Sequence, residues 1–239
     1  MSTDLRPGWP TARVTEAELP EWIISDTHFG HANINRYCDR PPGCDQAIQA
    51  AWRHAVASQQ SVLHLGDVYF GKDSVPAGVE QLPGKVSFIA GNHDRLAMQL
   101  AIQAIGWRLV PAFWVTLGGY NVAFTHYPLL ELEPRQFNVH GHIHNNVPEF
   151  SIRHLNCSVE VMAYRPRRIR GLIRERVAIL SDRQLARQWT QDVEEFWSRW
   201  PSLGEIDSEE RARDLRRQLR SEYVRWRWQR RPRSRMPTP

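Results

Sequence analysis

Residues 22–34 read WIISDTHFGHANI, an apolar run that ends at an aspartate and continues into two histidines. The run 21–25 is typical of a buried strand, because three large apolar residues follow one another within it. Asp26 and His28 come directly after that run, and His31 follows three residues later. Aspartate and histidine are also common in loops, so this stretch alone does not decide between a metal site and an ordinary loop.

Length, composition and charge limit the class of protein. The 239 residues are enough for one large domain, or for a domain with an extension. The content of 41% hydrophobic and 24% charged residues is typical of a folded protein in water. The formal net charge of +5 favours anionic partners, which include nucleic acids, nucleotides and membrane surfaces.

Two further features of the chain predict its compartment. No apolar run reaches the length of about 18 residues that a membrane span requires, and the first residues lack the apolar core of a signal peptide. We therefore expect a cytoplasmic protein. Cys38, Cys44 and Cys157 show no C-x-x-C spacing, which predicts reduced thiols and no disulfide framework.

Strand-like and helical patterns alternate along the first 160 residues. Strands are predicted at 21–25, 61–66, 85–91, 137–141 and 155–162, and helices at 44–58 and 95–106. The runs 108–117 and 120–125 flank Gly118 and Gly119, which indicates a hairpin. Because the first strand, helix and strand form a βαβ unit, we predict an α/β fold with a mixed sheet system.

Side chains with metal-binding groups follow five of these runs. They are Asp26 and His28, then Asp67, then Asn92, His93 and Asp94, then His126, and finally His142 and His144. Open α/β sheets bind ligands beyond the carboxyl ends of their strands, so we expect these side chains to converge. Carboxylate, imidazole and amide groups without thiolate suit manganese, iron or zinc. The set exceeds the roughly four to six donors of one ion, and two ions about 3.5–4 Å apart that share a carboxylate would use it fully.

These blocks resemble those of the calcineurin-like binuclear metallophosphoesterases. D-x-H at 26–28, G-D at 66–67, G-N-H-D at 91–94, a strand-end histidine at 126 and G-H-x-H at 141–144 occur in the order of that superfamily. The resemblance implies a four-layer αββα sandwich of two mixed β-sheets flanked by helices. It also implies a catalytic domain over residues 1–180.

The same resemblance implies a ligand set and two divalent metal ions, with manganese preferred over iron, zinc, nickel or cobalt. Asp26, His28, Asp67 and His144 would hold one ion, and the second would be held by Asp67, Asn92, His126 and His142. Asp67 would be the bridge. His93 would lie outside both metal shells as an acid near the leaving group, with Asp94 orienting it. Asn92 is also a candidate substrate contact, and His31 either contacts the substrate phosphate or caps its own loop.

The chemistry of such a centre agrees with hydrolysis of a phosphate ester. Two divalent ions beside two aspartates leave a positive site that attracts phosphate. Two such ions would lower the pKa of a shared water so that it could attack phosphorus in line, and an imidazolium could protonate the departing alkoxide. We therefore predict a metal-dependent phosphodiesterase that acts on nucleotides or single-stranded nucleic acid, with His93 as general acid. The alternatives are a broad-specificity phosphomonoesterase, and a nucleic-acid-binding protein that uses the fold as a scaffold.

Differences between this sequence and two branches of the superfamily argue against membership of those branches. Ser/Thr protein phosphatases carry G-D-x-x-D-R-G where this chain reads GDVYFGK at 66–72, and lipid A pyrophosphohydrolases carry arginine at the position of His93. The stretches SDTHFGHANI at 25–34 and NCSVEVMAYRP at 156–166 are similar to small bacterial and phage metallophosphoesterases.

Several other polar residues have structural interpretations. His64 and His140 lie within predicted strands, where we expect hydrogen-bonded or supporting roles. His54 and His154 are expected to have no chemical role. Arg36, Arg40 and Lys72 lie in loops that follow motif residues, where they could steer phosphate, but they are interpreted first as solvated surface charges.

The composition changes after the catalytic motifs, and residues 181–239 are predicted to form a helical extension. One helical pattern contains Leu185, Trp189, Val193, Phe196, Trp197 and Trp200, and a second contains Leu215, Leu219, Tyr223 and Trp226. Residues 211–235 hold eleven arginines against Asp214 and Glu222. The extension either packs on the catalytic domain or across a homo-oligomer, binds nucleic acid through arginine and aromatic side chains, or binds an anionic membrane surface.

Overall fold

The computed structural model describes residues 9–71, 74–145 and 151–199, with six separate positions of the C-terminal segment, Leu215, Gln218, Leu219, Ser221, Glu222 and Arg225. Some residues considered above lie outside this part of the chain: Lys72, Trp200, Tyr223, Trp226, most of the arginines of 211–235, and the side chain of Trp197. No helix among the described residues is both long and apolar enough to cross a bilayer.

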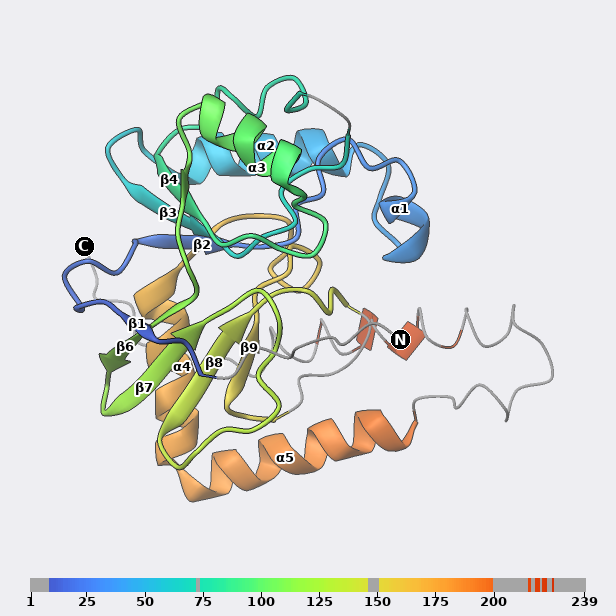
Figure 1. The fold of residues 1–239 in the computed structure, drawn as a ribbon. Helices are drawn as coiled ribbons and strands as arrows, with labels where there is room; N and C mark the ends of the chain where they lie inside the picture. The colour runs from blue at the N-terminus through green and yellow to red at the C-terminus, as the bar shows by residue number, and fades with distance from the viewer. Residues whose placement is uncertain are drawn as a thin grey trace, which may run out of the picture.

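One five-stranded sheet carries most of the sequence motifs. Its strand order is β10-β2-β3-β4-β5, with the strands at Arg167–Arg168, Trp22–Ile24, Ser61–His64, Lys85–Phe88 and Arg108–Leu109. Strands β2 to β5 are parallel, and β10 is antiparallel to β2. Helices α2 (Cys44–Ala55) and α3 (Leu96–Ala104) cover its outer face (Figure 1). Ile48 and Trp52 lie four residues apart on α2, so both are buried against this sheet.

The second sheet also has five strands, in the order β1-β6-β7-β8-β9. These strands span Ala12–Arg13, Phe113–Leu117, Tyr120–Phe124, Gln136–His140 and His154–Asn156. Strands β6 and β7 form an antiparallel hairpin, and the other neighbours are parallel. Gly118 and Gly119 connect the hairpin with φ of 60° and 80°, values that most residues with a side chain avoid.

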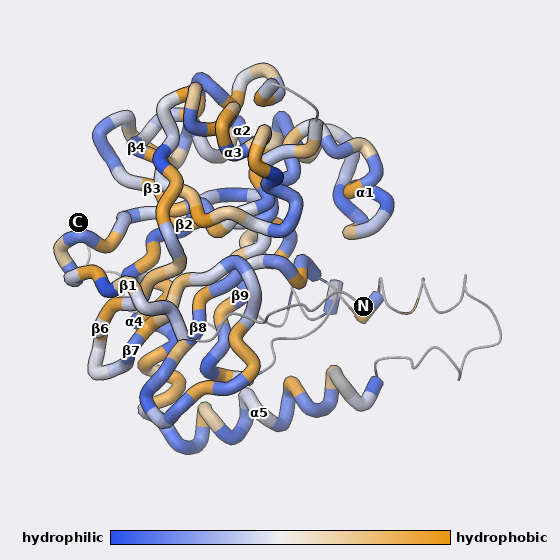
Figure 2. Tube along the Cα trace, in the orientation of Figure 1, coloured by the Kyte–Doolittle hydropathy of each residue, from blue (hydrophilic) through white to orange (hydrophobic). Residues whose placement is uncertain are grey.

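The main hydrophobic core lies between the two sheets. Ile23 and Leu63 enter it from one sheet, and Phe124, Phe137 and Val139 enter it from the other. Helix α4 (Ile169–Ser181) adds Ile169, Leu172 and Ile173 to the same core. Figure 2 shows that apolar residues concentrate in the strands of the interior. Successive side chains of a strand point to opposite faces of its sheet. In β8, Phe137 and Val139 face this core, so His140 lies on the face of the sheet away from it.

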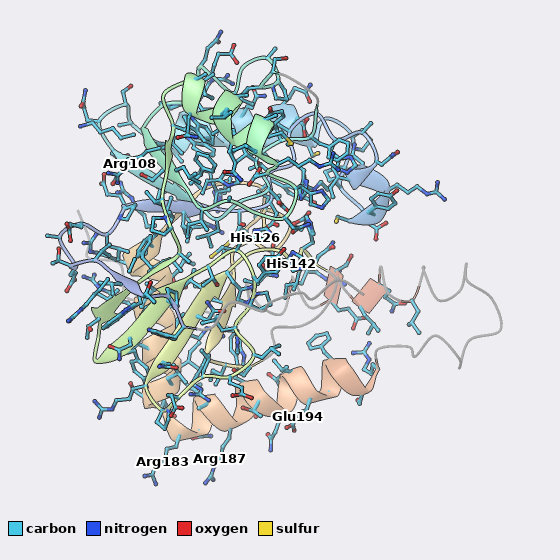
Figure 3. The ribbon with its side chains drawn as sticks, viewed as in Figure 1. Arg108, His126, His142, Arg183, Arg187 and Glu194 are labelled. Atoms are coloured by element: carbon cyan, nitrogen blue, oxygen red, sulfur yellow. The ribbon has the colours of Figure 1, made fainter. Side chains whose placement is uncertain are left out.

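Helix α5 (Arg183–Ser198) packs on α4. Trp189 and Val193 are buried in a small cluster with Ile179 of α4, and the guanidinium of Arg176 lies 4.1 Å from the ring of Trp189. Arg183, Arg187 and Glu194 project from the other side of α5 (Figure 3). The first helical pattern of the predicted extension is thus a packed amphipathic helix, whereas a domain boundary after residue 180 stays a prediction.

The α/β class and the two mixed sheets are confirmed, but two predicted strands are wrong in extent. The run 108–117 divides into β5 and β6, which belong to different sheets, because Pro111 between them has no N–H to continue a ladder. The run 155–162 is extended only as far as Asn156. The chain then turns, with Met162 N donating to Ser158 O at 3.1 Å and with φ of 56° and 55° at Ala163 and Tyr164.

Smaller differences affect the ends and the shortest elements. Helix α2 ends at Ala55 instead of residue 58. A four-residue helix, α1 (Ile34–Tyr37), and the two-residue strands β1 and β10 have too few residues for a periodic pattern, so the sequence did not predict them.

Candidate metal centre

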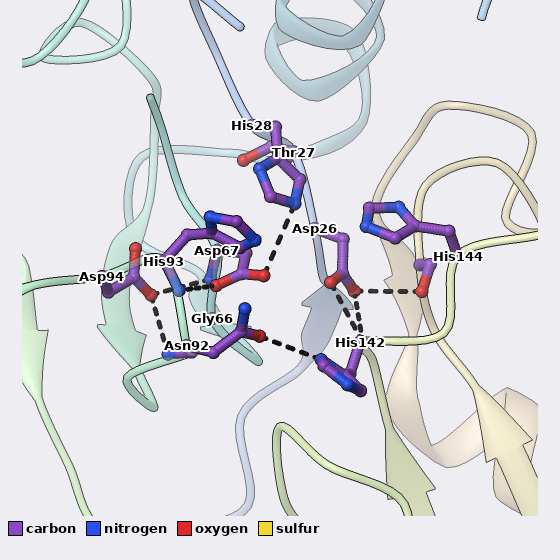
Figure 4. Close-up of polar contacts among 12 residues, drawn as sticks. Asp26, Thr27, His28, Gly66, Asp67, Asn92, His93, Asp94, His142 and His144 are labelled. Atoms are coloured by element: carbon purple, nitrogen blue, oxygen red, sulfur yellow. Dashed lines mark hydrogen bonds and ion pairs between the residues drawn. The ribbon is translucent and has the colours of Figure 1, made fainter. Parts of the chain in front are cut away.

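The seven predicted metal ligands converge where the two sheets meet. Asp26 and His28 follow β2, Asp67 follows β3 and Asn92 follows β4, whereas the other three come after β7 and β8 of the second sheet. Figure 3 labels His126 and His142 near the junction of the two sheets, and Figure 4 shows His142 together with Asp26 and Asn92 of the first sheet. The ring centroids of His28 and His144 are 5.0 Å apart, and those of His126 and His142 are 5.1 Å apart.

The ligands form two groups of donor atoms. In one group, Asp26, His28 and His144 each offer an atom, and in the other Asp67, His126 and His142 do so, with all atoms of a group within 4.8 Å of one another. Asp67 Oδ2 lies 3.5 Å from the Nε2 atom of His28 and 3.5 Å from that of His126, so it touches both groups. Asn92 Oδ1 lies 2.9 Å from His126 Nε2 and 2.9 Å from His142 Nδ1, which places it in the second group.

The hydrogen bonds around these side chains fit a bound cation. His28 is 1% exposed, yet neither of its ring nitrogens has a hydrogen-bond partner among the described residues. His126 Nδ1 donates to the Leu65 carbonyl at 2.8 Å, so in the neutral ring Nε2 carries a lone pair. That lone pair meets the amide oxygen of Asn92 at 2.9 Å. Two acceptors that face each other, and a buried imidazole without a hydrogen-bond partner, are the arrangement that a divalent ion would stabilise.

The backbone is strained at most of the predicted metal ligands. Positive φ is uncommon for residues with a side chain. Five of the seven predicted ligands have φ between 47° and 70°, namely Asp26, His28, Asp67, His142 and His144. Such conformations persist only where the surrounding structure enforces them, and they concentrate at functional sites.

Glycines in the motifs allow the loops to approach the carboxylates. A Cβ atom at Gly91 would lie 2.2 Å from Asp67 Oδ1, and one at Gly141 would lie 2.3 Å from Asp26 Oδ2. Side chains at either position would therefore displace a predicted ligand. The glycines of G-N-H-D and G-H-x-H are explained by this lack of space.

Burial sets the protonation of several ligands. It lowers the pKa of His28 to about 2 and that of His142 to about 4, so both imidazoles are neutral, the form that binds a metal. Burial raises the pKa of Asp67 to about 7, because its carboxylate is removed from water. A divalent ion beside Asp67 would stabilise the charged form and reverse that shift.

Two residues next to the centre were not predicted from the sequence. Glu160 Oε1 accepts a hydrogen bond from His144 Nδ1 at 2.9 Å and pairs with Arg40 Nη2 at 2.6 Å. The Arg40 guanidinium also donates to the carbonyls of Asp26 and Thr27. Arg40 is 4% exposed, so its interpretation as a solvated charge is wrong. Glu160 lies in the stretch NCSVEVMAYRP. A glutamate within a largely apolar stretch was the sequence signal that could have indicated a role for this residue near the centre.

The other predicted residues also lie near the centre. The backbone N–H of His93 donates to Asp67 Oδ1 at 2.8 Å, and its ring centroid is 5.1 Å from that of His28. The Asp94 carboxylate accepts the backbone N–H groups of Asp67, Val68 and Gly91 at 2.7–3.0 Å, so it joins the motif loops to one another. The orientation of the His93 ring by Asp94 stays a prediction.

The remaining histidines have structural contacts. His31 stacks on Phe70, and its ring centroid lies 5.8 Å from that of His28. His64 is fully buried and hydrogen-bonded, as predicted, and His140 is buried with Nδ1 2.9 Å from the Gly141 carbonyl oxygen. His154 is buried too, with Nε2 near the carbonyl of Leu129. The three cysteines are buried and form no disulfide.

Comparisons with known proteins agree with this arrangement. Residues 22–157 match the family model of the calcineurin-like phosphoesterase superfamily domain. An uncharacterized protein of Methanocaldococcus jannaschii is 30% identical over 160 residues, which are 61% of this chain and 84% of that protein. A protein of unknown function from Aquifex aeolicus has a crystal structure that covers 64% of this chain and 97% of its own, with a TM-score of 0.52 and 20% identity, so the likeness concerns the fold. Because the family model spans more than half of the chain and includes all the motif blocks, the chain belongs to the calcineurin-like phosphoesterase superfamily.

Proposed function

We propose that this protein is a phosphodiesterase that acts on nucleotides or nucleic acid and uses two divalent metal ions, with manganese as the first candidate. Membership of the superfamily supports metal-dependent hydrolysis of phosphate esters in general. The observation that supports two ions is the position of Asp67 Oδ2, which lies 3.5 Å from a ring nitrogen of each donor group. A carboxylate in that position suits a bridge between two ions.

The protein's own residues would have distinct tasks in this reaction. Asp26, His28 and His144 would hold one ion, and Asn92, His126 and His142 the other, with Asp67 shared. When bound, the two ions supply Lewis acidity toward the phosphate oxygens and lower the pKa of water. The motif loops would hold the ligands in their strained conformations before substrate arrives, which limits reorganisation during the reaction.

His93 is the candidate for protonating the leaving oxygen. Its ring lies beside His28 but belongs to neither donor group. Burial and then the imidazoles of His126 and His144 lower its pKa, while Asp94 acts in the opposite direction. The protonated form is therefore favoured on the acidic side of neutrality, and proton donation by His93 would be most effective there.

Metal content of two ligand variants tests the proposal. We expect Asp67→Ala to lose metal at both positions and to lose hydrolysis of bis-p-nitrophenyl phosphate, because its carboxylate touches both donor groups. Asn92→Ala should lower occupancy at one position only. Asn121→Ala, which changes an asparagine in the distant β6–β7 hairpin, should bind metal like the unchanged protein. Elemental analysis after dialysis against manganese measures all three, and full occupancy in Asp67→Ala would contradict the shared ligand.

A further inference from the structure

An aromatic surface borders the candidate metal centre. It consists of His31, Tyr37 and Phe70. The rings of His31 and Phe70 are stacked, with centroids 4.1 Å apart and planes inclined by 21°. The ring of Tyr37 stands edge-on to His31 at 6.3 Å. Two ring contacts join this surface to the centre. The ring centroids of His31 and the metal-ligand candidate His28 are 5.8 Å apart, and those of Phe70 and His93 are 6.2 Å apart.

The backbone holds this surface in place. Phe29 N donates to the Val68 carbonyl at 3.0 Å, and Phe70 N donates to the Phe29 carbonyl at 2.9 Å, so the loops after β2 and β3 are paired. Gly30 N donates to the Asp45 carboxylate at 2.7 Å. The stacked rings of His31 and Phe70 therefore need little reordering to receive a ligand.

The surface remains open although it is apolar. Phe70 is 46% exposed and Tyr37 is 61% exposed, whereas most large apolar side chains of this part of the fold are buried. The Phe70 side chain has no polar group, and the hydroxyl is the only polar group of Tyr37. Neither side chain carries a charge that suits a metal or a phosphate. Exposed aromatic rings beside a phosphate-binding position suit the flat part of a phosphate ester, because bases stack on such rings whatever their sequence.

We propose that the aromatic surface binds the nucleobase attached to the scissile phosphodiester, and that it selects nucleotide esters over alkyl esters. This inference rests on the proposed function, since the metal centre would hold the phosphate of the same substrate. His31 would complete the stack from the side of the metal centre. Phe70 and Tyr37 would present the faces and edges that the base contacts.

Two esters with one leaving group test the proposal. Thymidine 5′-(p-nitrophenyl phosphate) and methyl p-nitrophenyl phosphate differ only in the group that stays on phosphorus. With the manganese-loaded full chain, we expect kcat/KM to be about tenfold higher for the thymidine ester, the size of effect that stacking of one base supplies. Phe70→Ala should bring the ratio of the two values close to one, and Phe70→Trp should keep it. Leu185→Ala is the matched control, because Leu185 is also 46% exposed but lies on α5.

A binding measurement separates this inference from the proposed function. Calorimetry with thymidine 5′-phosphate and with methyl phosphate needs no turnover, and we expect the first to bind more tightly in the unchanged protein but not in Phe70→Ala. If neither ester is hydrolysed while the nucleotide still binds more tightly, the proposed function fails and the aromatic surface stands. Equal affinities, or a ratio that is unchanged in both Phe70→Ala and Tyr37→Ala, would overturn the aromatic surface as a base-binding site.

Discussion

Glu160 positions a predicted ligand although it lies outside the five metal-binding blocks. By accepting the Nδ1 proton of His144, it leaves Nε2 of that ring available for a metal, and its pair with Arg40 holds the carboxylate in position. We expect Glu160→Gln to weaken manganese binding by about 10–100-fold, the usual effect of losing such a partner. Competition with a chelator measures the affinity.

The control for Glu160 must separate metal binding from folding. Removing the charge leaves Arg40 buried without its partner, which can cost about 3–5 kcal/mol of folding free energy. Metal affinity is therefore compared on protein shown to be folded by circular dichroism, with the exposed Glu194→Gln as the matched variant. Unchanged manganese affinity in folded Glu160→Gln would exclude the positioning role.

His93 offers a second prediction for a single residue. If its imidazole protonates the leaving oxygen, His93→Ala should lose about 10²–10⁴-fold in rate on an ester with an alkoxide leaving group, and far less with p-nitrophenolate, which departs without a proton. The rate on the alkoxide ester should also fall as the pH rises through the lowered pKa of His93. Steady-state rates on both esters measure the difference, and equal losses would remove His93 from this role.

At the scale of elements, the contact between α4 and α5 explains the first half of the tryptophan-rich extension. Trp189 is buried against Ile179 and lies under the Arg176 guanidinium. We expect Trp189→Ala to lower the free energy of unfolding by about 3–5 kcal/mol, because a large buried ring is replaced by a cavity. Thr190→Ala, on the exposed side of the same helix, should change it by less than about 0.5 kcal/mol. Thermal unfolding compares them, and equal melting temperatures would show that α5 contributes little to stability.

For the whole molecule, buried imidazoles make stability depend on pH. Burial lowers the pKa of His64 to about 3, so the folded protein keeps this ring neutral while the unfolded chain binds a proton below its usual pKa of 6.5. The stability is therefore complete above pH 6.5 and declines as the pH falls toward 3, by about 1.4 kcal/mol per pH unit for each such proton. His28 and His142 act in the same direction in the metal-free protein. Two groups oppose them: Asp67, whose pKa is raised to about 7, and His144, whose pKa lies well above 6.5 because the effect of burial is outweighed by Glu160.

Denaturation of the metal-free protein at pH 7 and pH 5 measures this dependence. We expect a lower free energy of unfolding at pH 5. His64→Gln should remove about one proton from the slope, and His54→Gln, at an exposed position of α2, should leave the slope unchanged. A stability that does not vary between these pH values would contradict the neutral buried state of the imidazoles.

The predictability of the fold differed among its elements for physical reasons. The sequence predicts a helix at 44–58 and a hairpin around Gly118 and Gly119 because these signals are local, and the structure has a helix at Cys44–Ala55 and an antiparallel pair of β6 and β7. The run 108–117 was misread because one apolar stretch feeds two different sheets, and strand pairing is decided by distant partners. The strand predicted at 155–162 is wrong in extent for a related reason. Ser158 is placed by its contact with Asp26, and Glu160 is placed by its contacts with Arg40 and His144.

By itself, the sequence determined the types of side chain at the centre and their places after strands, because a metal-binding motif is a local pattern of donors and glycines. It thereby determined the superfamily. Only the tertiary structure decided that Asp67 touches both donor groups, that Arg40 is buried beside Glu160, and that Phe70 and Tyr37 stay exposed. Those outcomes depend on how two sheets pack and on contacts between residues as far apart as Arg40 and Glu160. Such contacts leave no periodic signal in the chain, because burial, charge pairing and exposure are properties of the assembled neighbours.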